Sequence, residues 1–363
     1  DSFPRDHSSI IHDLYVHISS TDSISVFFCD HLTTFEITNV LPTQTLRSDY
    51  LIQIYPSVPT LAEPFAQGYF NVMAVEDSTW ISVNVMGSVD DTCGLGSQYT
   101  FLLPHAGDCH QVLSTPTGDI SGSRVTALNG KKIAVYQGNS ATKVPVSSNQ
   151  YMGGFLLEQA IPTCYWGRHF FVTKTKKPTP DRVRITTLHD SCVIKVNNNN
   201  VTTINEGETY EYEANSPGDV DYVVTSKQAH IGLYTAIEPA PRYQHCTMLN
   251  ILPWEQAAEA ITFCNPNAIM HGGQIYPWDS MYLDIVTKSN EIDYIFFDSI
   301  AINNLFSIIP HNTDFSHACF KISTGYHSIY TTEGSGFTAS LNWVNGGDVG
   351  HSFSAGPAPR DRQ

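Results

Sequence analysis

Basic side chains are scarce in this chain. Its 363 residues include 19 Lys and Arg against 35 Asp and Glu, which gives a formal net charge of 19 − 35 = −16. Nucleic-acid binders present a basic face to the phosphate backbone, and a strongly acidic protein repels it. We therefore expect no nucleic-acid partner.

Long apolar runs are lacking too. No run approaches the roughly 18 residues that a membrane-spanning helix needs, so we predict no membrane span. The first residues, 1–6, have neither the basic start nor the apolar core of a signal peptide, so we expect a leader to be absent or removed. The tail, 356–363, has linker composition, which leaves room for further domains.

Paired cysteine motifs are missing. The eight cysteines fall singly, with no Cys-x-x-Cys and no zinc-ligand spacing, so we predict no metal site. An even cysteine count with few Lys and Arg suits an oxidising compartment, which predicts a secreted or cell-surface protein. Loop lengths rank Cys93 with Cys109 as the first candidate disulfide and Cys246 with Cys264 as the second. The remaining cysteines are equally well explained as small buried thiols.

Catalytic signatures are also missing. The sequence contains no G-x-S-x-G elbow, no H-E-x-x-H helix, no phosphate loop and no dinucleotide fingerprint. Acidic neighbours such as Asp90 with Asp91, or Glu206 with Glu208, could bind calcium or act as an acid and base pair. Turn and edge-strand carboxylates explain them more simply. We predict no catalytic residue, no cofactor and no enzyme activity.

What the sequence does show is a period of two. Segments such as 71–75, 80–85, 182–185 and 192–196 alternate apolar with small or polar residues, which is typical of half-buried strands. Clusters of Gly, Asn, Asp and Ser between them favour tight turns. Helical periodicity is almost absent. Only 254–260, after Pro253, predicts about two turns of helix.

The chain repeats itself. A branched residue followed by proline occurs at 41–42, 161–162 and 252–253. The residues eight and ten positions beyond each proline are large and apolar: Tyr50 and Ile52, Phe170 and Val172, Ile261 and Phe263. A hairpin pattern at 75–83 recurs without gaps at 188–196. Chance similarity among β-rich segments is the alternative, but a fixed offset in three places argues against it.

We therefore predict an all-β protein of three tandem antiparallel β-sandwich-like modules. The expected organisation is a lead-in at 1–23, modules at 24–132, 133–230 and 231–355, and a tail or linker at 356–363. In this prediction, each module opens with the strand pattern that closes the previous one. This leaves open that neighbouring modules share strands at their borders.

Several segments together resemble a known family. They are 132–138 (KIAVYQG), 144–145 (VP), 157–162 (LEQAIP), 165–172 (YWGRHFFV), the flanking 75–79 and the closing 353–356. Their order and spacing resemble the IgGFc-binding protein N-terminal domain family from about residue 20 to 357. The resemblance implies a secreted or surface-displayed binding or adhesion region, with immunoglobulin Fc or mucin as partner classes. It carries over no binding residue.

The residues offer several candidates for contacts. The basic residues of the acidic chain concentrate at Lys174, Lys176, Lys177, Arg182 and Arg184, which could dock an acidic partner or simply form a solvated hairpin. Tyr276 and Trp278 lie in a Gly- and Pro-containing segment, where they could contact a partner. Asn200 begins an Asn-Val-Thr glycosylation sequon at an expected hairpin tip.

Three functions remain open at this point. The first is an extracellular, non-enzymatic recognition or adhesion module that binds a protein or glycoprotein. The second is a structural spacer within a longer secreted protein. The third is a secreted carbohydrate-active hydrolase, which needs two accessible carboxylates about 5–10 Å apart. We favour the first; the sequence leaves the oligomeric state open.

Overall fold

The computed structural model describes residues 9–11, 15–22, 24–30, 36–58, 66–90, 96–148, 153–176, 179–214, 219–236, 246–265, 268–271, 274–277, 280–344 and 352–354. Antiparallel strands form nearly all of the regular structure in this part of the chain. The helices within it are four 3-10 turns: η1 (Thr163–Tyr165), η2 (Trp254–Gln256), η3 (Ile292–Tyr294) and η4 (Asn303–Leu305). The prediction of an all-β fold is confirmed.

The first two sheets, which we call unit 1, enclose one core. The strand orders are β1 (Ser9–Ile11), β8 (Cys109–Leu113), β5 (Gly68–Ala74), β10 (Ile133–Thr142), β11 (Gly154–Gln159), and β4 (Asp49–Leu51), β9 (Arg124–Ala127), β6 (Thr79–Asn84), β7 (Gln98–Leu103). In β6 the alternation holds: Ile81 and Val83 are buried, whereas Trp80 is exposed. Residues of both sheets meet in a single apolar cluster.

Unit 2 is one seven-stranded sheet because a single long strand, β17 (Val220–Tyr234), serves both halves. Its first half pairs with β12 (Gly167–Thr173) and β14 (Cys192–Val196), and β14 pairs with β15 (Asn199–Ile204). Its second half pairs with β13 (Asp181–Thr187) and β18 (Met248–Ile251), and β13 pairs with β16 (Thr209–Ala214). The core again collects side chains from both halves.

Unit 3 returns to two sheets. Their orders are β25 (Ser307–Ile308), β26 (Phe315–Ile322), β22 (Ser280–Lys288), β28 (Phe337–Val344), β29 (Ser352–Ser354), and β19 (Ala260–Asn265), β27 (Gly325–Thr331), β23 (Ile295–Phe297), β24 (Ile300–Ala301). Two hairpins stand beside them: β2 (Phe27–Asp30) with β3 (Glu36–Asn39), and β20 (Ala268–His271) with β21 (Gln274–Pro277).

The same strand order recurs in the three units. The order β8-β5-β10-β11 in unit 1 matches β16-β13-β17-β18 in unit 2 and β26-β22-β28-β29 in unit 3. All six apolar residues placed eight and ten positions after the repeated prolines are buried in the three cores. Because β10 and the second half of β17 pair back into units 1 and 2, cuts at 132 and 230 pass through sheets. The predicted module boundaries stay a prediction.

The predicted helix at 254–260 is wrong. Only a single 3-10 turn, η2, forms there, and β19 begins at Ala260. The reason is Ala258, whose backbone N–H donates to Phe337 O at 2.7 Å and whose carbonyl accepts from Phe337 N at 2.8 Å. This pairing with β28 needs extended backbone and ends the turn.

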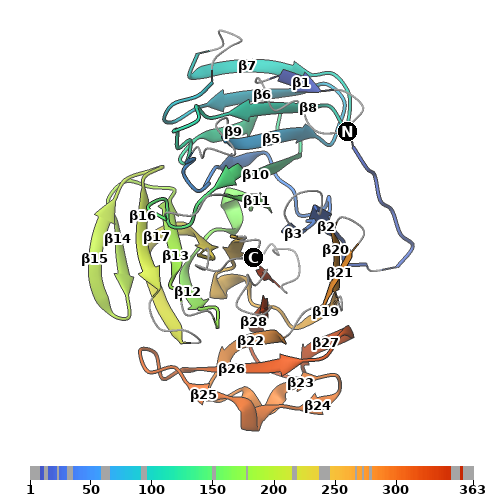
Figure 1. Ribbon diagram of the computed structural model, residues 1–363, viewed down its shortest axis with the longest axis vertical. Helices are drawn as coiled ribbons and strands as arrows, with labels where there is room; N and C mark the ends of the chain where they lie inside the picture. The colour runs from blue at the N-terminus through green and yellow to red at the C-terminus, as the bar shows by residue number, and fades with distance from the viewer. Residues whose placement is uncertain are drawn as a thin grey trace.

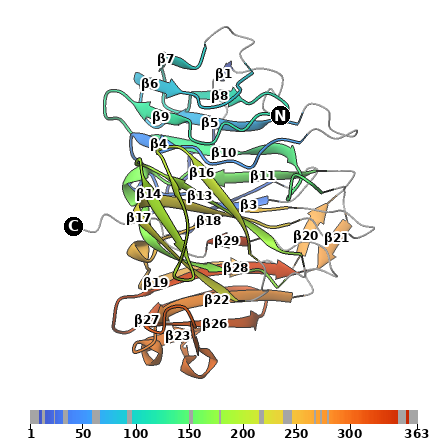
Figure 2. The same ribbon diagram turned by 90° about the vertical axis from the view of Figure 1, so that its left-hand side faces the viewer.

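The three units surround a centre built from short strands (Figure 1). β3 packs against β11 and β29, and β18 packs against the same two strands. Figure 2 shows unit 1 at the top, unit 2 in the middle and unit 3 at the bottom. An apolar cluster that includes Tyr55, Leu156 and Tyr234 joins units 1 and 2, and Phe171 with Val286 and Ile309 joins units 2 and 3.

Candidate functional site

The basic cluster predicted from the sequence is largely neutralised by ion pairs. Lys174 is 7% exposed, and its Nζ lies 3.0 Å from Asp221 Oδ1. Arg182 lies 3.5 Å from Glu213 Oε1. Lys176 is exposed, and Lys177 lies outside the described residues. A docking role for this cluster stays a prediction, but Lys174 does not present its charge to solvent.

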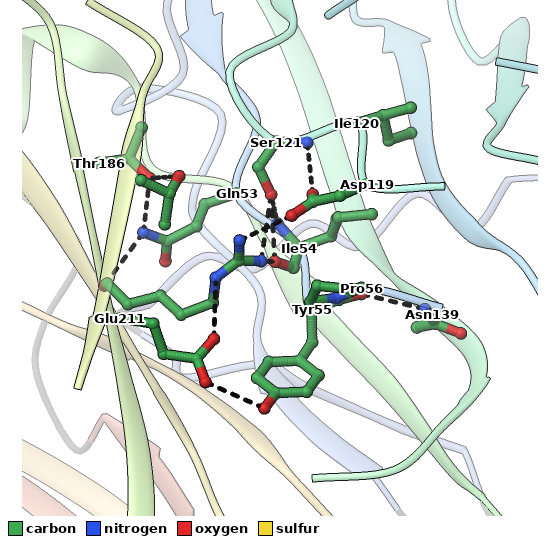
Figure 3. Close-up of polar contacts among 12 residues, drawn as sticks. Gln53, Ile54, Tyr55, Pro56, Asp119, Ile120, Ser121, Asn139, Thr186 and Glu211 are labelled. Carbon is green, nitrogen blue, oxygen red and sulfur yellow. Dashed lines mark hydrogen bonds and ion pairs between the residues drawn. The ribbon is translucent and has the colours of Figure 1, made fainter. Parts of the chain in front are cut away.

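Arg184 forms a buried link between units 1 and 2. Its Nη2 lies 2.7 Å from Asp119 Oδ2, and its Nε lies 3.6 Å from Glu211 Oε2. Its Nη1 donates to the carbonyl of Ile54. Figure 3 shows Ile54, Ser121 and Asp119 facing Glu211 and Thr186 across this junction.

The charges in this link are strongly coupled. Burial alone would raise the pKa of Asp119, but attraction to Arg184 and hydrogen bonds from Ser121 and Arg184 outweigh it and lower that pKa. Tyr55 OH donates to Glu211 Oε1 at 3.3 Å. The surrounding contacts occupy the guanidinium within the fold, so they indicate a structural role for Arg184.

Cys246 and Cys264 are not bonded to each other in this structure, and their pairing stays a prediction. Cys246 is buried between units 1 and 2, where its Sγ lies 3.6 Å from Thr142 O. Cys264 is exposed on β19 of unit 3. The loop length between the two cysteines suggested a pair, but they lie in different parts of the fold. Cys109 is buried in β8, and its predicted partner Cys93 lies outside the described residues.

The remaining predicted contacts are placed as follows. Asn200 is exposed at the start of β15, next to the two-residue turn formed by Asn197 and Asn198. Both turn residues have positive φ, as a type I′ hairpin requires. Tyr276 lies in β21, where only the backbone is described, and Trp278 lies outside the described residues. Glycan attachment and partner contact at these positions stay predictions.

A cysteine, a histidine and an aspartate meet in unit 3. His317 Nε2 lies 2.7 Å from Asp284 Oδ1, and Cys319 pairs with Asp284 across β26 and β22. Burial, and then the charge of Asp284, raise the pKa of Cys319 to about 12. Nucleophilic cysteines need a lowered thiol pKa. This arrangement therefore resembles a packed core contact more than a catalytic centre.

One exposed apolar surface lies at the outer end of unit 3. We call it the unit 3 tip and define it by Tyr294, Ile300, Leu305 and Ile308. Ile300 is 67% exposed and Ile308 is 60% exposed, and the other two side chains are also exposed. These four large apolar side chains are exposed within 15 residues of sequence. Apolar residues scattered singly over a surface are ordinary, whereas a group of this kind often marks a contact site.

Both tip strands lie at sheet edges. β24, which carries Ile300, ends one sheet of unit 3, and β25, which carries Ile308, ends the other. Natural proteins usually protect such edges with charge, proline or a covering element. An edge that carries exposed isoleucine instead is suited to contact with another chain.

Acidic side chains accompany the apolar ones. Residues 288–314 contain Glu291, Asp293, Asp298 and Asp314 against Lys288, which gives 1 − 4 = −3 for this segment. Asp293 holds η4 in place because its Oδ1 accepts from Asn303 Nδ2 at 2.7 Å. Sequence reasoning missed this surface because a run such as 300–309 reads as buried strand. Only the pairing shows that these strands are short and lie at edges.

The geometry defines a class: a repetitive antiparallel β protein with an apolar, acid-flanked surface at one end. The family model for IgGFc binding protein matches residues 36–341. That is most of the chain, so this protein belongs to the IgGFc-binding family. No curated protein matches the sequence.

Similarity to solved structures is low. A β-D-glucuronidase from Dictyoglomus thermophilum has a TM-score of 0.15 at 9% identity, covering 84% of this chain and 45% of that one. An anti-sigma factor domain-containing protein from Clostridium clariflavum has 0.16 at 8%, covering 77% and 100%. The central fibronectin-III array of RIM-binding protein has 0.17 at 10%, covering 95% and 100%.

Within the described ranges, no helix is long and apolar enough to cross a bilayer.

Proposed function

We propose that this chain is a non-enzymatic, extracellular recognition module that binds a protein or glycoprotein partner. The observation that carries this proposal is the family match over residues 36–341. The family's name makes immunoglobulin Fc the first partner to test, with a mucin glycoprotein as the second. A secreted or cell-surface location accords with the family and with the composition of the chain.

The unit 3 tip is the contact surface that we propose. Its exposed isoleucines supply apolar area, and the two sheet edges supply backbone groups to a partner. Its acidic flank suits a partner patch with an apolar centre and basic surroundings. The net charge of −16 disfavours a second copy of this chain as the partner.

Two alternatives receive less support. A glycoside hydrolase needs two carboxylates that face a substrate, whereas the neighbouring carboxyls Glu36 and Glu158 are buried in the centre of the fold. A structural spacer within a longer protein accords with the tandem units and predicts no ligand at all. The binding experiment separates the spacer from the recognition module.

Biolayer interferometry of the full chain against immobilised Fc and mucin tests the proposal. The test variant carries both Ile300→Asp and Ile308→Asp. The matched control is Leu128→Asp, which changes another exposed apolar residue that lies in unit 1 instead of unit 3. We expect saturable binding at micromolar or lower concentration for the wild type and the control, and at least about tenfold weaker binding for the double variant. Binding should weaken between about 50 and 300 mM salt.

Each outcome has a distinct meaning. A folded wild type that binds neither Fc nor mucin contradicts the recognition proposal and favours the spacer. Equal binding by all three chains keeps recognition but moves the contact away from the unit 3 tip.

A further inference from the structure

The N-terminal hairpin closes the ring of units. Ile37 of β3 is buried in the core of unit 3, and Phe27 of β2 packs against the same cluster. Ser25 Oγ donates to Thr262 O at 3.2 Å, which adds a polar contact to β19. The chain then continues from β3 into β4 of unit 1. A segment from the start of the chain therefore completes a unit formed by its end.

Side chains hold the central strands together. Gln159 of β11 accepts from Leu41 N through its Oε1 at 2.7 Å, and Gln159 N donates to Thr38 Oγ1 at 3.1 Å. Glu36 Oε1 accepts from Met248 N of β18 at 3.2 Å. β3 is thus attached to β11 and β18 by individual polar contacts instead of a continuous ladder.

Two carboxyl groups lie at this junction. Glu36 is 1% exposed and Glu158 is 5% exposed. Glu158 Oε2 accepts from Thr38 Oγ1 at 2.8 Å and from Asn250 Nδ2 at 3.1 Å. Glu36 Oε2 is buried and has no hydrogen-bond partner among the side chains and backbone groups that the structure describes. A buried carboxylate with an unpartnered oxygen is costly, whereas the protonated acid is tolerated.

From this geometry we infer that β3 is a proton-dependent clasp. While Glu36 and Glu158 are protonated, β3 stays packed against β11 and β18, and Ile37 stays in the core of unit 3. When the pair loses protons, the buried charges repel each other and the clasp opens locally, releasing the hairpin β2–β3 from unit 3. This inference is independent of the partner proposed above.

The charged surroundings support the clasp. Burial, and then repulsion from Glu158, raise the pKa of Glu36 well above its ordinary value. Burial raises the pKa of Glu158 to about 8. β18 contributes the neutral Asn250, and β29 has no titratable residue in Ser352–Ser354. β2 places a further acidic residue, Asp30, opposite Glu36 in the strand pair. On β17, burial lowers the pKa of His230 to about 4 and leaves its ring neutral.

The directions of these pKa shifts define the pH range in which the clasp responds. A carboxyl whose folded pKa is raised stabilises the closed form fully below its unfolded value of 4.5, and this contribution is lost as the pH rises through the folded pKa. His230 acts in the opposite sense and only below about its unfolded pKa of 6.5. Between pH 6.5 and 8 the two carboxyls therefore dominate this site.

Hydrogen exchange with mass spectrometry on the full chain tests the clasp. After correction for the intrinsic pH dependence of exchange, we expect the protection of residues 36–39 to fall at least about tenfold between pH 6.5 and 8. Residues 181–187 in β13, within the core of unit 2, should stay more protected than residues 36–39 at every pH, because they exchange only through larger openings. In Glu158→Gln the fall at 36–39 should shrink strongly, and Glu36→Gln is the second variant should the first misfold.

Glu333→Gln, which alters an exposed carboxyl in unit 3, is the matched control and should behave as the wild type. Protection at residues 36–39 that equals that of β13 at each pH, or an unchanged fall in both folded glutamine variants, overturns the clasp.

Discussion

The junction between units 1 and 2 and the centre of the ring both bury charge, but they neutralise it differently. At the junction, Asp119 and Glu211 surround Arg184, so the acids keep their charge beside a cation. At the centre, Glu36 and Glu158 lie close together. In the described part of the chain, the groups that shift their pKa values are hydrogen-bond donors and, for Glu36, the carboxyl of Glu158, with no cation among them. A proton takes the place of the missing cation there.

The two solutions give opposite responses to pH. The lowered pKa of Asp119 stabilises the fold above its unfolded value of 3.8, and this contribution is lost as the pH falls through the folded pKa. The raised pKa values of Glu36 and Glu158 stabilise the fold at low pH, and their contribution is lost as the pH rises. The junction therefore contributes most to stability at high pH, and the centre contributes most at low pH.

The largest expected effect in this comparison comes from removing the cation at the junction. Arg184→Met leaves Asp119 and Glu211 without their buried partner, which should lower the free energy of unfolding by about 3–5 kcal/mol. Urea unfolding at pH 7, followed by tryptophan fluorescence, measures the change. A loss below about 1 kcal/mol would show that the junction does not depend on this pair.

The smallest expected effect comes from a neighbouring cation that is more exposed. Arg182 lies on the same strand and pairs with Glu213 at 3.5 Å, where Glu213 is 43% exposed. Arg182→Met should cost about 1 kcal/mol or less, because solvent screens such pairs. Arg182→Met is the matched control for Arg184→Met and is measured by the same urea titration. Similar losses in both variants would mean that burial does not distinguish the two arginines.

Much of the scaffold could be predicted from local pattern. Alternation in segments such as 80–85 identified strands, and the residues after each repeated proline identified core positions. Both signals arise within about ten residues of sequence, where the period of a strand is visible. The helix after Pro253 failed because a distant strand, β28, pairs with Ala258 and fixes its conformation.

The polar sites could not be predicted because their members come from distant strands. Asp119 and Arg184 are 65 residues apart, and Thr38 bonds to Glu158 across 120 residues. The cluster of basic residues near 180 looked like a docking surface because its partners, Asp221 and Asp119, are not neighbours in sequence. The unit 3 tip was missed for the converse reason, since sequence alone does not show which strands lie at edges.

The pH dependence of global stability tests the central claim most directly. For the wild type, the free energy of unfolding should fall by about 1.4–2.7 kcal/mol per pH unit between pH 6.5 and 8, which corresponds to one or two protons released on unfolding. The double variant Glu36→Gln with Glu158→Gln should remove most of this slope. A wild-type stability that stays level across this range, or a slope that persists in the folded double variant, would contradict the account.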